Sequence, residues 1–92
     1  MRLDLFLKAS RLCLRRTVAQ KLCDAGLVSI NGKPAKSAHV VNPGDEIAIR
    51  THSRLVVARV ERVPAGHNTS RKEAPTLLQI VRDEALDDGE VK

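Results

Sequence analysis

The hydrophobic periodicity of the chain changes at Gly26, and this change constrains the fold more than any other feature of the sequence. Before it, apolar residues recur at helical spacing in two segments: Leu3, Phe6 and Leu7 in the first, and Val18, Leu22 and Ala25 in the second. After it, short apolar runs alternate with turn residues, as they do in strands. The sequence therefore predicts two helices followed by a sheet.

Thr17 and Gly26 are typical of the ends of the second helix. A threonine hydroxyl accepts a hydrogen bond from a backbone amide of the first turn, so Thr17 is predicted to be the N-cap. Glycine readily takes the left-handed conformation that follows a helix, so Gly26 is predicted to stop it. The first helix is expected within residues 1–10.

The segment after Gly26 predicts a small antiparallel sheet. Asn31-Gly32 is typical of a type I′ turn between two strands, and Pro43-Gly44 marks a second turn. The predicted strands are residues 27–30, the short return 33–36, residues 46–49 and the longer run 55–60.

The C-terminal third predicts a loop, a helix and an acidic tail. Residues 64–70 are loop-like, and Pro75 suits the first turn of a helix that has Leu77, Leu78 and Val81 on one face. The expected fold class is therefore α+β, with a C-terminal helix that covers the sheet edge. The expected organisation is an N-terminal domain at 1–62, then a linker, C-terminal helix and acidic tail at 63–92.

Charge is segregated along the chain, which carries a net +5. Residues 1–36 contain eight Lys or Arg against two Asp, whereas the residues from Glu73 onward are net acidic. An ordinary solvated surface would mix the two signs. This asymmetry indicates a polyanionic partner at the basic end.

Arginines cluster ahead of the second helix, and a helix pair would bring them onto one surface with Arg2. A guanidinium donates paired hydrogen bonds to phosphate and stays charged, and a helix N-terminus also favours anions. Lysines extend the basic strip, although each lysine alone is equally typical of a solvated surface. The candidate RNA-binding residues are Arg2, Lys8, Arg11, Arg15, Arg16, Thr17, Lys21, Lys33 and Lys36.

Other function classes find little support in the sequence. Phe6 is the single aromatic residue, which disfavours binding by base stacking. The histidines are scattered, and Cys13 and Cys23 lack the spacing of a metal site, so we expect no enzyme activity, metal or cofactor, and two buried thiols. No apolar run reaches the ~20 residues that span a bilayer and no signal peptide is evident, so a cytoplasmic location is expected.

An ordered set of residues resembles the S-four RNA-binding domain family over about residues 1–50. The matching positions are Arg2-Leu3-Asp4, Phe6-Leu7, Ser10-Arg11, Arg16-Thr17, Ala19, Gly26, Val28, Ile30-Asn31-Gly32 and Pro43-Gly44-Asp45-Glu46. The resemblance implies an αL RNA-binding motif, in which two helices and the following hairpin grip structured RNA. Leu5 departs from the lysine that often follows Arg-Leu-Asp in such proteins.

Within that family the chain resembles free-standing members of bacterial ribosome-associated quality control, and the related fifteen-kilodalton heat-shock protein. The resemblance implies a protein that binds large-subunit rRNA and peptidyl-tRNA, with Arg2 and Arg16 as contacts, and that supports a partner factor in alanine tailing of stalled chains. We expect the chain to act as a monomer. A general structured-RNA binder, acting on mRNA or in ribosome assembly, stays open. A DNA-binding helix-turn-helix is disfavoured, because the arginines precede the second helix and a hairpin follows it.

Overall fold

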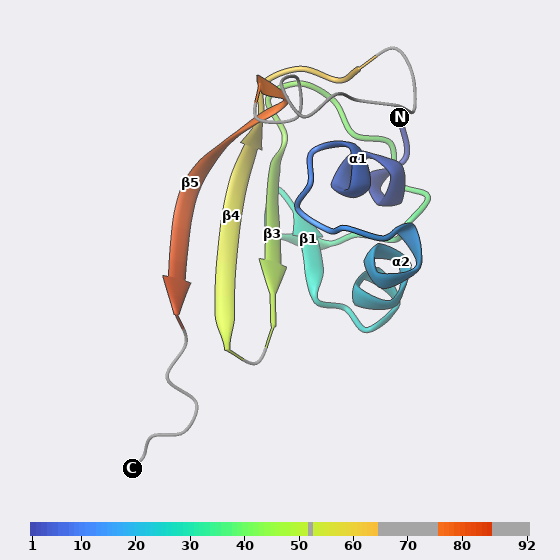
Figure 1. The fold of residues 1–92 in the computed structure, drawn as a ribbon, viewed down its shortest axis with the longest axis vertical. Coiled ribbons are helices and arrows are strands. Elements are labelled where there is room, and N and C mark those ends of the chain that lie inside the picture. The colour runs from blue at the N-terminus through green and yellow to red at the C-terminus, as the bar shows by residue number, and fades with distance from the viewer. Residues whose placement is uncertain (52, 65–75, 86–92) are drawn as a thin grey trace.

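The computed structural model describes residues 1–51, 53–64 and 76–85, which form two helices beside a five-stranded sheet. The helix pair lies next to β1, and β4 and β5 form the opposite side of the molecule (Figure 1). Neighbouring strands are antiparallel in the order β2-β1-β3-β4-β5. The elements are α1 (Leu3–Ala9), α2 (Arg16–Asp24), β1 (Val28–Ile30), β2 (Lys33–Pro34), β3 (Glu46–Arg50), β4 (Arg54–Val60) and β5 (Leu78–Ala85).

The core lies between the helices and the sheet. The α1 residues Leu3, Phe6 and Leu7 are fully buried, as their helical spacing predicts. In β3 the apolar residues Ile47 and Ile49 are buried while the residues at the strand ends are exposed. The apolar residues of the helices and those of the strands therefore pack into one core, and the α+β prediction is confirmed.

The end of α2 follows the prediction, but its start does not. Gly26 has φ +77°, and the amides of Gly26 and Leu27 donate to the carbonyls of Cys23 and Leu22, which is a Schellman motif. At the other end the N-cap is Arg15, in extended conformation, and no side chain caps the helix. The prediction of Thr17 as N-cap is wrong, because the helix begins two residues earlier than predicted, at Arg16, and Thr17 lies within it.

The Asn31-Gly32 turn is confirmed, with φ +54° and +86° at the two residues. The turn is also held by a side chain: Oδ1 of Asn31 accepts from the amide of Glu46 at 3.0 Å, and Nδ2 donates to Asp45 at 3.1 Å. The same asparagine therefore tolerates the left-handed conformation and ties the β1–β2 hairpin to the start of β3.

The predicted C-terminal helix is wrong over the residues that the structure describes. Leu78–Ala85 forms strand β5, which pairs along β4 with an irregularity between Val57 and Ala58. Without β5, β4 would leave a row of backbone groups without partners, and pairing satisfies them. Residues 65–70 of the predicted loop, Pro75 and the acidic tail lie outside the described residues. Strand β5, which follows residue 62 in the chain, pairs with β4 and so belongs to the same sheet as the N-terminal segment.

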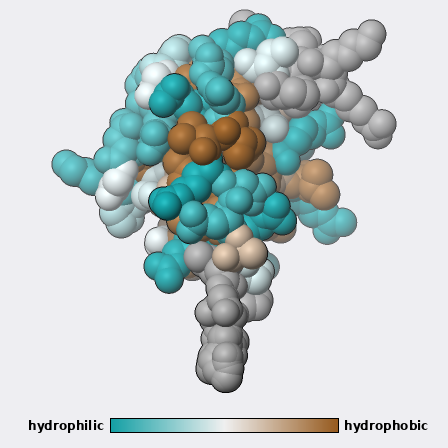
Figure 2. All heavy atoms as spheres, turned by 90° about the vertical axis from the view of Figure 1, so that its left-hand side faces the viewer, coloured by the Kyte–Doolittle hydropathy of each residue, from teal (hydrophilic) through white to brown (hydrophobic). Residues whose placement is uncertain are grey.

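Strand β5 is largely solvent-exposed. Ile80 and Val81 are 46% and 48% exposed, and the view onto this side shows hydrophobic surface ringed by hydrophilic residues (Figure 2). Ion pairs accompany them: Arg54 with Asp83, and Arg82 with Glu84. Charged side chains on an edge strand are a common protection against pairing with another chain. None of the helices in the described segments is long and apolar enough to cross a membrane.

Candidate nucleic-acid interface

Asp4 lies in the first turn of α1 and is fully buried, yet it is charged. Backbone bonds fix its position, because the amides of Leu3 and Asp4 donate to the carbonyls of His39 and Ser37 at 2.8 and 3.2 Å. A buried carboxylate is costly unless donors surround it. The residues around Asp4 supply those donors.

Two arginines from separate elements converge on Asp4. Nε of Arg2 donates to Oδ1 at 3.2 Å, with Nη2 at 3.4 Å from Oδ2, and Nε of Arg16 donates to Oδ2 at 3.1 Å. Both arginine side chains remain 44% exposed. Arg16 contacts Asp4 through Nε, which leaves its two terminal nitrogens able to donate to an external acceptor.

Gln20 and the Leu5 amide complete the shell around Asp4. Nε2 of Gln20, one helical turn beyond Arg16, donates to Oδ2 at 2.9 Å, and the Leu5 amide donates to Oδ1 at 2.8 Å. Burial raises the pKa of Asp4, but the hydrogen bonds from Gln20, Arg16 and Leu5 and the charge of Arg2 outweigh it, so the pKa lies below its ordinary value. Asp4 therefore stays ionised and orients both guanidinium groups.

Arg11 and Arg15 lie in the connection between the helices. Arg11 has φ +68° in the turn after α1, and its amide donates to the carbonyl of Lys8 at 3.1 Å. Arg15 precedes α2 and lines a pocket on the other side of that helix from Asp4. Both side chains, and that of Lys8, belong to exposed residues.

The remaining candidate residues are spread over three elements. Thr17 and Lys21 are exposed on α2. Lys36 belongs to the turn 36–39, in which the carbonyls of Ser37 and His39 accept hydrogen bonds from the start of α1, so the turn lies beside that end of the helix. Lys33 lies in β2, at an edge of the sheet. The structure thus brings Arg2 and Arg16 into one cluster, while Lys33 belongs to a separate edge.

Sequence reasoning did not single out Asp4 and Gln20 as site residues. Neither can contact phosphate through a positive charge, so a search for cations passes over them. A signal existed: Arg16 and Gln20 lie four positions apart, on one face of α2, and a lone acidic residue stands two positions after Arg2. We name the group Arg2, Asp4, Arg16 and Gln20 the Asp4 cluster.

The two cysteines are buried free thiols, as expected. Burial raises the pKa of Cys13, and burial together with the nearby Asp4, Cys13 and Asp24 raises the pKa of Cys23 to about 11. Thiols with raised pKa values are poor nucleophiles near neutral pH. Within the described residues, no group of His, Cys, Asp and Glu is placed to hold a metal ion.

Residues 1–47 match the model of the S4 domain family. Over 94% of its length the chain is 43% identical to the RQC P-site tRNA stabilizing factor of Bacillus subtilis, of which it covers 98%. It is 39% identical over 97% of its length to the factor of the same name from Listeria monocytogenes, covering 95% of it.

Two solved structures share the fold. The chain resembles a solution structure of the hypothetical protein HP1423, with 31% identity, a TM-score of 0.78, and coverage of 91% of this chain and 100% of the other. It also resembles Vibrio cholerae Heat Shock Protein 15, described as trimeric, with 28% identity, a TM-score of 0.76, and coverage of 87% and 80%.

Proposed function

The chain belongs to the S4 domain family, and on that premise we propose that it is a non-enzymatic RNA-binding factor of ribosome-associated quality control. In this proposal it binds the large ribosomal subunit through rRNA and holds peptidyl-tRNA in place, and thereby supports alanine tailing of stalled nascent chains. The family assignment agrees with the resemblance drawn from the sequence. The names of the relatives support the tRNA and quality-control parts of the proposal.

One observation carries the RNA-binding proposal: a single buried carboxylate orients two half-exposed arginines. Free arginine side chains lose considerable conformational freedom when they bind phosphate. Because Asp4 already holds Arg2 and Arg16 through their Nε atoms, part of that entropy is lost on folding rather than on binding. The Asp4 cluster is therefore suited to accept phosphate groups whose spacing matches the two arginines.

The mechanism proposed for the cluster is positioning. Phosphate contacts give affinity and orientation but do not read sequence, so selectivity for a ribosomal site depends on RNA shape. In this proposal Arg11, Lys8 and Lys36 add charge around the cluster, and Arg15 adds charge on the other side of α2. Thr17 and Lys21 extend the basic surface along α2. Lys33 contributes less, because it lies at a sheet edge.

The proposed setting is the bacterial cytoplasm, with the alanine-tailing factor as protein partner. We propose that the chain acts there as a monomer, although the Vibrio cholerae protein is described as trimeric. RNA binding by single chains needs no second copy, because Arg2, Asp4, Arg16 and Gln20 all come from one chain.

A general structured-RNA binder is the second candidate. It is favoured by the same observation, because arginines that bind phosphate can bind many folded RNAs, and the one aromatic residue of the chain, Phe6, is buried and cannot stack on a base. The two candidates differ in the particle that the protein accompanies in cells.

Sucrose-gradient co-sedimentation from cells with stalled translation tests the proposal. The wild type should migrate with large subunits that carry peptidyl-tRNA, and Arg16→Ala should move to the top of the gradient. Arg59→Ala is the matched control, since Arg59 is an exposed arginine of β4 outside the Asp4 cluster. Migration of the wild type with free RNA favours the general binder, and unchanged migration of Arg16→Ala contradicts the role of the cluster.

A further inference from the structure

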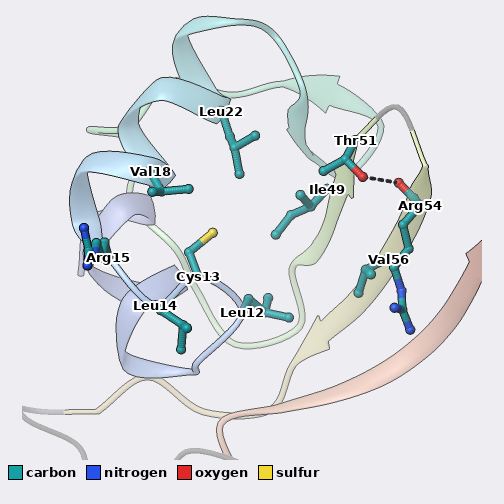
Figure 3. A pocket seen from close by; sticks show the side chains of 10 residues that line it. All are labelled: Leu12, Cys13, Leu14, Arg15, Val18, Leu22, Ile49, Thr51, Arg54 and Val56. Carbon is teal, nitrogen blue, oxygen red and sulfur yellow. Dashed lines mark hydrogen bonds between the residues drawn. The ribbon is translucent and has the colours of Figure 1, made fainter.

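An open apolar groove of about 560 Å³ lies on the side of α2 away from Asp4. It runs between the α1–α2 connection and the sheet, with Ile49 and Val56 on the sheet side and Leu12, Leu14 and Val18 on the helix side (Figure 3). Its volume is in the range of about 300–1,000 Å³ that is common for ligand sites.

Two large aliphatic side chains of the groove lie in water. Leu14 is 78% exposed and Val18 is 45% exposed. Single exposed aliphatics are ordinary, but here they adjoin an apolar hollow. Covering this surface would bury it together with the walls of the groove.

Two of the polar side chains that line the groove, those of Thr51 and Arg54, are satisfied by partners within the chain. The Thr51 hydroxyl lies 3.3 Å from the carbonyl of Arg54, to which it donates, and the Arg54 guanidinium donates to both carboxylate oxygens of Asp83 at 2.6 and 2.8 Å. Arg15 differs: in the part of the chain that the structure describes, it lines the groove without an ion-pair partner. One edge of the groove is therefore cationic and the opposite edge is neutral.

These features discriminate between classes of ligand. A nucleobase in the groove would lose water from its polar edge and meet few free hydrogen-bonding groups, and the groove offers no aromatic side chain for stacking. An aliphatic side chain gives up no hydrogen bonds when it leaves water, and it gains contacts with Ile49 and Val56. A carboxylate beside it would reach the charge of Arg15.

We propose that this groove binds a segment of another protein that presents an aliphatic side chain beside a carboxylate. The aliphatic group enters between Val18 and Val56, and the carboxylate pairs with Arg15 at the rim. The inference rests on the proposed function in one respect: the segment belongs to a protein bound to the same RNA. Neighbouring residues then serve two surfaces, because Arg15 lies at the rim of the groove while Arg16 is held by Asp4.

Site-specific photo-crosslinking in cells tests this proposal. Benzoylphenylalanine replaces Leu14, whose exposure makes the exchange compatible with folding, or replaces Arg59 outside the groove as the control. The expected result is a protein adduct from position 14 alone, and its crosslinked peptide contains Leu, Ile or Val next to Asp or Glu. Adducts with RNA, a second copy, the chain's own acidic residues 86–92 or a peptide without carboxylates overturn the proposal. So does labelling no stronger than that of the control.

Purified protein then separates this proposal from the RNA-binding proposal. Anisotropy of a synthetic peptide with the crosslinked sequence should show affinity at least 10-fold weaker for Val18→Ser. Val81→Ser is the matched control, because Val81 has nearly the same exposure (48% against 45%) and lies outside the groove. Arg16→Ala should leave peptide affinity unchanged while it weakens RNA binding, and Val18→Ser should do the reverse. Equal peptide affinity for the two valine variants contradicts the groove, whatever the RNA result.

Discussion

Nε of Arg16 donates a hydrogen bond to Oδ2 of Asp4 across 3.1 Å, and this contact joins the first turns of α1 and α2. The carboxylate is fully buried while the guanidinium is 44% exposed, so one end of the pair belongs to the core and the other to the surface. The contact therefore couples the packing of the helix pair to the orientation of the Arg16 guanidinium, which is a candidate to bind phosphate.

Asp4→Asn should lower both stability and RNA affinity. The amide oxygen replaces one of two acceptors, and its NH2 group faces the donors of Arg16 or Gln20. The expected loss is on the order of 2–3 kcal/mol in the free energy of unfolding. Urea denaturation measures it, with Asp24→Asn as the control, since Asp24 is exposed at the end of α2. Equal shifts of the two midpoints would contradict the role of the buried carboxylate.

Stability should fall in acid through Asp4. Its pKa is lower in the folded state than its ordinary value of 3.8, so the folded state favours the ionised form. The contribution is full above the unfolded pKa of about 4 and is lost as the pH falls through the lowered native pKa. Urea unfolding between pH 2 and about pH 7 should show this loss, and Asp4→Asn should reduce the pH dependence of the free energy of unfolding. Asp83→Asn should flatten it less, because water screens the exposed Arg54–Asp83 pair.

Arg16→Ala should reduce the salt dependence of binding to a folded rRNA fragment. Each phosphate contact that is lost reduces the slope of log K against log salt by about 1. Filter binding or anisotropy at several salt concentrations measures the slope. Arg59→Ala removes the same charge from β4 and should leave the slope nearly unchanged. An equal reduction of the slope in both variants would indicate that net charge alone attracts the RNA.

Gly26→Ala should destabilise the fold through backbone conformation alone. A methyl group at this position would meet no atom within 4 Å, but φ is +77°. The left-handed conformation costs an alanine about 1–2 kcal/mol. Thermal or urea unfolding should place Gly26→Asn between wild type and Gly26→Ala, because asparagine tolerates this conformation better. If Gly26→Ala left the free energy of unfolding unchanged, the Schellman turn would have to rearrange at no cost.

Local features of the sequence predicted much of the fold. The helical spacing of Leu3, Phe6 and Leu7, the stop at Gly26 and the turn at Asn31-Gly32 are all found where they were expected. Each depends on conformational preferences of a few neighbouring residues, so it can be read without knowledge of the rest of the chain. The arginines of the candidate interface were found in the same way, by their charge.

Tertiary structure decided the features that depend on distant partners. Residues 78–85 contain an apolar pattern that suits either a helix or a strand. They form a strand because pairing with β4 satisfies the backbone groups at its edge. Asp4 is the only fully buried charge among the described residues, and its role appears when Arg16 and Gln20 arrive from α2. The sequence by itself determined the presence of the two N-terminal helices, the turns and the cationic residues. Packing determined the last strand and the anion that orients those cations, because both arise from contacts between segments far apart in the chain.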